Sequence, residues 1–183
     1  MPEPLVLLPG MMCDARLFSH QFLALNTDRA VMVAPLTGAS TIGALAQQVL
    51  DAAPARFALA GLSMGGIVAM EMLSRAPDRI TRLALMDTNP LPETPQAAAA
   101  REPHIVGVQN GRLEEIMREE MKPNYLAPGA GRVEVMNTVM EMARDLGPDV
   151  FVAQSRALQR RPDQQKTLRN CKVPALVLCG RHD

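Results

Sequence analysis

Short apolar runs alternate with amphipathic stretches along the first half of the chain. Such runs, bounded by Pro or Gly, are typical of strands buried on both faces, whereas apolar residues three or four positions apart are typical of helices. The pattern predicts strands at 5–8, 30–34, 57–60 and 83–86, and helices at 15–25, 41–53 and 65–75. Because alternating strands and helices form right-handed crossovers, we expect an α/β fold with a mostly parallel sheet covered by helices on both faces.

The pattern changes after about residue 92, where helical periodicity continues without a predicted strand. Apolar stripes occupy 113–121, 135–143 and 151–158, the last of them through Phe151, Gln154 and Leu158. The alanine run 97–100 and the segment 128–131 are predicted as connectors. An apolar run at 174–180 predicts a return to a buried parallel strand. We therefore expect a first part of the core at 1–91, an inserted helical cap at 92–170 and a returning core strand at 171–183.

The composition favours a single globular domain that acts on a small molecule. The chain has 183 residues, 48% of them hydrophobic, and 19 basic residues balance 19 acidic ones. Without a basic surplus or many aromatic residues, we expect binding neither to nucleic acid nor to a membrane surface. Three cysteines without paired or metal-like spacing predict a reducing compartment and no zinc site. The N-terminus lacks the cationic region of a signal peptide, so we expect a cytoplasmic protein.

A serine stands in the sequence Gly61-Leu62-Ser63-Met64-Gly65, between a predicted buried strand and a predicted apolar helix. A serine on so sharp a strand-to-helix turn needs residues without side chains two positions away on either side, and Gly61 and Gly65 supply them. Ser63 is thus the candidate nucleophile of a GxSxG nucleophile elbow.

Backbone N–H groups near this serine form the candidate oxyanion hole. The Met64 N–H falls at the start of the helix, where the helix dipole favours a developing negative charge. A second donor is expected from the loop after the first strand, and Met11 follows the turn-forming Pro9 and Gly10 there.

A serine nucleophile needs a base, and the base needs an acid that orients it. Asp183 follows the last predicted strand, at the edge of the sheet where α/β sites form, and is the candidate acid. The histidines fit the base less well, because His20 lies in the first helix and His182 adjoins the acid with its side chain directed the opposite way. A pairing of His104 with Asp87 keeps the order Ser, acid, His and stays open as an alternative.

The chain resembles the α/β-hydrolases, in particular the small bacterial serine hydrolases with a helical cap. The resemblance covers nearly the whole chain and rests on the segments 8–12, 61–66, 161–163 and 173–180 and the aspartate at 183. It implies the α/β-hydrolase fold and no cofactor or metal. By position, it also implies Ser63 as nucleophile, Asp183 as triad acid, and Met11 and Met64 as oxyanion donors.

The chain departs from that family in two ways. Many relatives have His-Gly where this chain has Pro9-Gly10, a difference that should leave the backbone donor intact. Family members usually continue past the acid with a helix, a strand and a loop that bears the catalytic histidine, so we expect a truncated chain that is nearly inactive alone. The strand at 175–179 would then form an apolar sheet edge open to association, including a homo-oligomer.

Together these features predict a serine hydrolase that cleaves a small carboxylic ester or an (enol-)lactone through an acyl-enzyme. A serine at the elbow argues against the dehalogenase and epoxide hydrolase chemistries, in which relatives use a carboxylate. Two alternatives stay open. One is a C–C bond hydrolase or lyase-type synthase with the same triad, and the other is a non-catalytic binding protein of the same fold.

Overall fold

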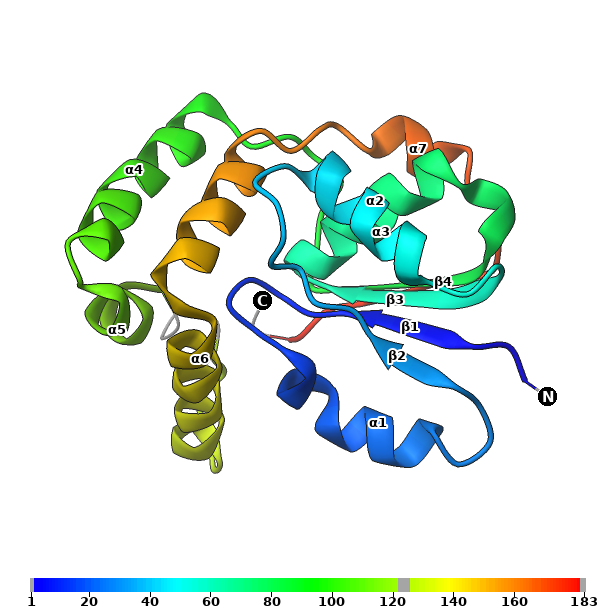
Figure 1. Cartoon of the computed structure of the whole chain (residues 1–183), viewed down its shortest axis with the longest axis horizontal. Helices are drawn as coiled ribbons and strands as arrows, with labels where there is room; N and C mark the ends of the chain where they lie inside the picture. The colour runs from blue at the N-terminus through cyan, green and yellow to red at the C-terminus, as the bar shows by residue number, and fades with distance from the viewer. Residues whose placement is uncertain (1, 122–125, 182–183) are drawn as a thin grey trace.

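The computed structural model describes residues 2–121 and 126–181 of the chain, and its centre is a five-stranded parallel sheet (Figure 1). The strand order is β2-β1-β3-β4-β5. The strands are β1 (Leu5–Leu8), β2 (Val31–Val33), β3 (Phe57–Leu62), β4 (Ile80–Met86) and β5 (Ala175–Leu178). All five lie where the apolar runs predict them, and the predicted α/β fold class is confirmed.

Helices cover both faces of the sheet (Figure 1). The short helix η1 (Ala15–Phe18) and α1 (Ser19–Leu25) lie on one face, and α2 (Ile42–Ala52) and α3 (Met64–Arg75) lie on the other. Thr41 caps α2, because its hydroxyl accepts the Ala44 N–H at 3.2 Å. After α3, the turn η2 (Pro77–Arg79) leads into β4. This arrangement buries all of β3 except its last residue, and the chain emerges from the sheet at that point.

The helices after β4 lie beside the sheet rather than on its faces, apart from the last of them, which packs on α3 (Figure 1). They are α4 (Pro95–Gln109), α5 (Leu113–Glu115), the π-helix η3 (Ile116–Met121), α6 (Arg132–Gln159) and α7 (Gln165–Arg169). The division into core and cap at residues 92 and 170 stays a prediction. Met117 and Met140, on two of the predicted stripes, are buried.

One predicted connector is wrong. The alanine run 97–100 lies inside α4, which begins after Thr94, whose hydroxyl accepts the Ala97 N–H at 3.1 Å. The run has no apolar periodicity, but alanine has the highest intrinsic helix propensity, so a capped alanine run forms a helix without a stripe. The other predicted connector, 128–131, does precede α6.

The strand β5 is exposed, which corrects the prediction of a buried strand at 174–180. It pairs with β4 only, at the edge of the sheet, and Leu176, Val177 and Leu178 are 58%, 75% and 54% exposed. The predicted apolar sheet edge is therefore present. Among the described residues, no helix combines the length and apolarity that crossing a membrane requires.

Candidate active site

Ser63 occupies a sharp turn between β3 and α3, which we call the serine turn (residues 61–66). Its backbone has φ 53° and ψ −115°, a conformation that costs a non-glycine residue about 1–3 kcal/mol. The glycines on either side permit this geometry. A Cβ on Gly61 would lie 2.3 Å from the Gly65 carbonyl oxygen, and a Cβ on Gly65 would lie 2.1 Å from that of Leu8.

Hydrogen bonds from neighbouring elements hold the serine turn. The Ser63 N–H donates to the carbonyl of Met86, at the end of β4, at 2.8 Å. The Ser63 carbonyl accepts the N–H groups of Gly66 and Ile67 and also the Thr88 hydroxyl, at 2.8 Å. Thr88 is not among the residues predicted for the site. Its signal in the sequence is a hydroxyl residue two positions after the end of β4, the strand next to the serine turn.

Met64 lies at the first position of α3, and its side chain is only 1% exposed. The N–H groups of a helix's first turn have no acceptor within the helix, and the helix dipole places partial positive charge there. The buried side chain serves packing, so the part of Met64 available to chemistry at this turn is its backbone.

The loop after β1 (residues 9–14), which we call the β1 loop, packs directly against the serine turn. A Cβ on Gly10 would lie 3.7 Å from the Cβ of Ser63 and 3.2 Å from the Leu62 side chain. Gly10 also accepts the Cys13 N–H at 3.2 Å, which closes a tight turn around Met11 and Met12. The structure therefore brings together Met11, Ser63 and Met64, three of the residues predicted for the site.

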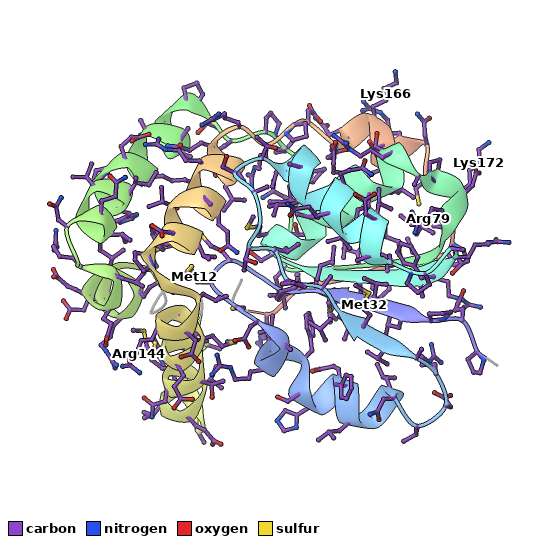
Figure 2. The ribbon with its side chains drawn as sticks, viewed as in Figure 1. Met12, Met32, Arg79, Arg144, Lys166 and Lys172 are labelled. Carbon is purple, nitrogen blue, oxygen red and sulfur yellow. The ribbon has the colours of Figure 1, made fainter. Side chains whose placement is uncertain are left out.

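The helix α6 holds the other side of the β1 loop (Figures 1 and 2). The Met12 N–H donates to Gln154 Oε1 at 2.8 Å, and the Asp14 N–H points to Met142 Sδ at 3.3 Å. Arg16, just beyond the loop, bridges Asp14 to Asp145 of the helix. Gln154 lies on a predicted apolar stripe but was not predicted as a site residue. The signal for it in the sequence is a polar residue within that stripe.

The predicted acid lies outside the described residues. This holds for both His182 and Asp183, so their positions relative to Ser63 stay predictions. The chain leading to them is anchored near the serine turn, because the Gly180 N–H donates to Asp87 Oδ1 at 2.6 Å. Asp87 directly follows β4 and has φ 43°, and its N–H donates to the Leu178 carbonyl.

The alternative base and acid lie on different parts of the structure. Asp87 follows β4, close to the serine turn, and one of its carboxylate oxygens accepts the backbone bond just described. His104 is half-buried in α4, and His20 is exposed on α1. The roles of these residues stay predictions.

A cavity of about 650 Å³ lies far from the serine turn, at the opposite end of the strands. Its lining includes Arg56, Ile80 and Lys166, and Ile80 is the first residue of β4. Among the described residues, no group of three or more His, Cys, Asp or Glu side chains could hold a metal ion.

Solved structures resemble this chain along almost its whole length. A thermophilic esterase from Thermogutta terrifontis is 27% identical with a TM-score of 0.85, and the match covers 99% of this chain and 72% of that one. An enol-lactonase from Burkholderia xenovorans is 23% identical with a TM-score of 0.85, covering 100% and 75% of the two chains. A hydrolase from Pseudomonas aeruginosa is 25% identical with a TM-score of 0.79, covering 97% and 72%. The chain has the α/β-hydrolase fold.

Ser63 stands at the strand-to-helix turn between β3 and α3 of this fold. The similarities to the esterase and to the hydrolase from Pseudomonas aeruginosa support a hydrolase of this fold. No protein-family model matches the chain, and a search of curated proteins found no match.

Proposed function

We propose that this protein is a serine hydrolase that cleaves a small carboxylic ester or an (enol-)lactone through an acyl-enzyme. The observation that carries the proposal is the strained backbone of Ser63, at φ 53°, immediately before the N-terminus of α3. A binding protein has no need of such a turn, whereas a nucleophile gains exposure above the sheet from it. The similar solved structures of an esterase and an enol-lactonase guide the choice of substrate class.

The reaction begins with attack of Ser63 Oγ on the carbonyl carbon of the substrate. A histidine base takes the hydroxyl proton, and the N–H groups of Met64 and Met11 donate to the oxyanion of the tetrahedral intermediate. Collapse of the intermediate expels the alkoxide or enolate, which receives the proton from the histidine. A water molecule then attacks the carbonyl carbon of the acyl-enzyme, and the histidine takes a proton from that water. The second tetrahedral intermediate releases the carboxylic acid, and Ser63 Oγ receives the proton from the histidine.

We assign Asp183 as the acid that orients the histidine. The pairing of Asp87 with His104 is the alternative within the chain. Two substitutions separate the assignments: with Asp183 as acid, we expect Asp183→Asn to lower Ser63-dependent hydrolysis by about 10³-fold or more and His104→Gln to leave it close to that of the parent. The opposite result would favour His104 and Asp87 instead.

The substitution Ser63→Ala tests the nucleophile. We expect hydrolysis of p-nitrophenyl esters and lactones by the protein to fall by about 10³-fold or more. A fluorophosphonate should label the tryptic peptide that contains Ser63 in the parent protein and leave the variant unlabelled. Ser74→Ala is the matched control, because Ser74 is an exposed serine on the same helix. Equal activity or labelling in Ser63→Ala would overturn the proposal.

Substrate profiling separates the remaining alternatives. A C–C bond hydrolase would turn over vinylogous diketones faster than esters, and a binding protein would turn over neither. We expect the Ser63-dependent turnover rate of esters or lactones to exceed that of diketones.

A further inference from the structure

Gln154 joins two loops at the end of the sheet where Ser63 lies. Its side chain is buried, with 1% of the residue exposed, and it comes from the second half of α6. Its Oε1 accepts the Met12 N–H at 2.8 Å, and its Nε2 donates to the Leu36 carbonyl at 2.8 Å. Met12 lies in the β1 loop, and Leu36 lies in the loop after β2. One amide from the cap region thus binds the backbone of both loops.

The bond to Met12 constrains the candidate oxyanion donor next to it. Met12 has φ 54°, a left-handed conformation that a methionine adopts only when its surroundings hold it there. The peptide plane between Met11 and Met12 carries the Met12 N–H, so the bond to Gln154 fixes the rotation of the backbone about Met11. The Met12 N–H is directed to α6, and the donor predicted from this loop is the N–H of the preceding residue, Met11.

The burial of Gln154 makes this contact specific. A buried amide that loses its hydrogen bonds is not compensated for its lost hydration, so the arrangement of the two loops and α6 that satisfies both bonds is favoured. Two further contacts support the same arrangement from the first half of the helix, through Met142 and Asp145. Between the two halves, α6 is kinked at Gly147, which has φ 81° and ψ 175°.

We propose that Gln154 is a positioning residue that sets the direction of the Met11 N–H for the oxyanion, so that the cap region completes the catalytic site. The inference rests on the proposed function. It assigns to a side chain 91 positions after Ser63 in the sequence (154 against 63) a part in stabilising the tetrahedral intermediate. Figure 2 shows Met12 beside α6, where the β1 loop reaches that helix.

The test is Gln154→Met. Methionine keeps the length and volume of the side chain and removes both hydrogen bonds. We expect kcat on a p-nitrophenyl ester to fall about 10- to 100-fold while KM changes less than about 3-fold, because a misplaced oxyanion donor weakens the transition state more than the ground state. Gln159→Met is the matched control, since Gln159 lies on the same helix and its bonds within the described part of the chain go to Ala98 and Glu102 of α4 and to Arg156.

A second measurement separates positioning from general loss of structure. A trifluoromethyl ketone forms a tetrahedral adduct with the serine, and its inhibition constant should rise by about the same factor as kcat falls. Exchange of the Met12 amide hydrogen should also become faster in Gln154→Met and not in Gln159→Met. A variant with the parent's kcat and inhibition constant, or an equal kcat loss in the control, would overturn this inference alone. A parent protein without Ser63-dependent hydrolysis would overturn the proposed function and this inference together.

Discussion

The two halves of the candidate oxyanion hole are built in different ways. The serine turn supplies the Met64 N–H and is held by contacts within the α/β core, from the ends of β1 and β4 and from two glycines of its own. The β1 loop supplies the Met11 N–H and has no comparable set of glycines around Met12. Its left-handed residue, Met12, is hydrogen-bonded to α6 through a side chain 142 positions away in the sequence.

The comparison shows two ways to hold the backbone of a site: steric exclusion by nearby atoms, and a hydrogen bond from a helix distant in the sequence. Around Ser63, any side chain larger than hydrogen at Gly61 or Gly65 would overlap backbone atoms, so the α/β core itself fixes the geometry. Around Met12, the geometry depends on the turn that the Cys13 N–H closes and on the buried amide from α6. Substitutions of Gly61 and Gly65 should therefore act on folding, and substitutions in α6 should act on catalysis with a smaller loss of stability.

The largest expected effect comes from Gly65→Ala. The new Cβ would lie 2.1 Å from the Leu8 carbonyl oxygen and 2.7 Å from that of Pro9, and both atoms belong to backbone that is fixed in the sheet or at its end. We expect a loss of about 4 kcal/mol or more in the free energy of unfolding, up to failure to fold, as measured by urea denaturation.

Gly38→Ala is the control for that substitution. Its Cβ would meet only the far end of the Gln48 side chain, which can move away. We expect the urea midpoint of Gly38→Ala to stay close to that of the parent. A folded Gly65→Ala protein with the parent's midpoint would show that the serine turn is not under steric control.

An intermediate effect is expected from Gly147→Ala, at the kink of α6. No atom of residues 2–121 or 126–181 lies within 4 Å of the new Cβ, so the cost is the backbone strain of φ 81° and ψ 175°, about 1–3 kcal/mol. If the helix straightens to relieve it, Met142 and Gln154 no longer both reach the β1 loop, and kcat should fall more than stability alone explains. We would measure kcat and the urea midpoint together.

The control at the kink is Gly131→Ala, at the start of the same helix. Gly131 has φ 87° and also has open space around its Cβ, so its substitution should cost stability of the same kind. It should leave kcat within about 2-fold of the parent, because the start of α6 does not bond to the β1 loop. Equal kcat losses in the two variants would contradict a role for the kink in catalysis.

The contrast between the two regions also explains what could be predicted from the sequence. The strands and the serine turn follow from short apolar runs and from glycines at fixed positions, which are local signals. The bond between Met12 and Gln154 could not be predicted, because it depends on how a kinked helix docks on a loop formed much earlier in the chain. The helix over 97–100 was missed because its signal is alanine propensity and the Thr94 cap rather than periodicity.

The smallest expected effect concerns charge at the base of the β1 loop. The side-chain hydrogen bond from Arg16 lowers the pKa of Asp14 below its usual range, and Arg16 also pairs with Asp145 of α6.

A carboxyl with a lowered pKa stabilises the fold above its unfolded pKa, near 4, and loses that contribution as the pH falls through its folded pKa. Asp14→Asn keeps an acceptor for the Arg16 backbone N–H, which Asp14 Oδ1 accepts at 2.9 Å, and removes the charge together with the hydrogen bonds that Oδ2 accepts from the Arg16 guanidinium. Because the pair is partly exposed, we expect the parent to exceed the variant by about 0.5 kcal/mol in free energy of unfolding at about pH 7. Urea titrations should show that difference shrinking towards zero at about pH 3 and below, and a difference that grows on acidification would contradict the assignment.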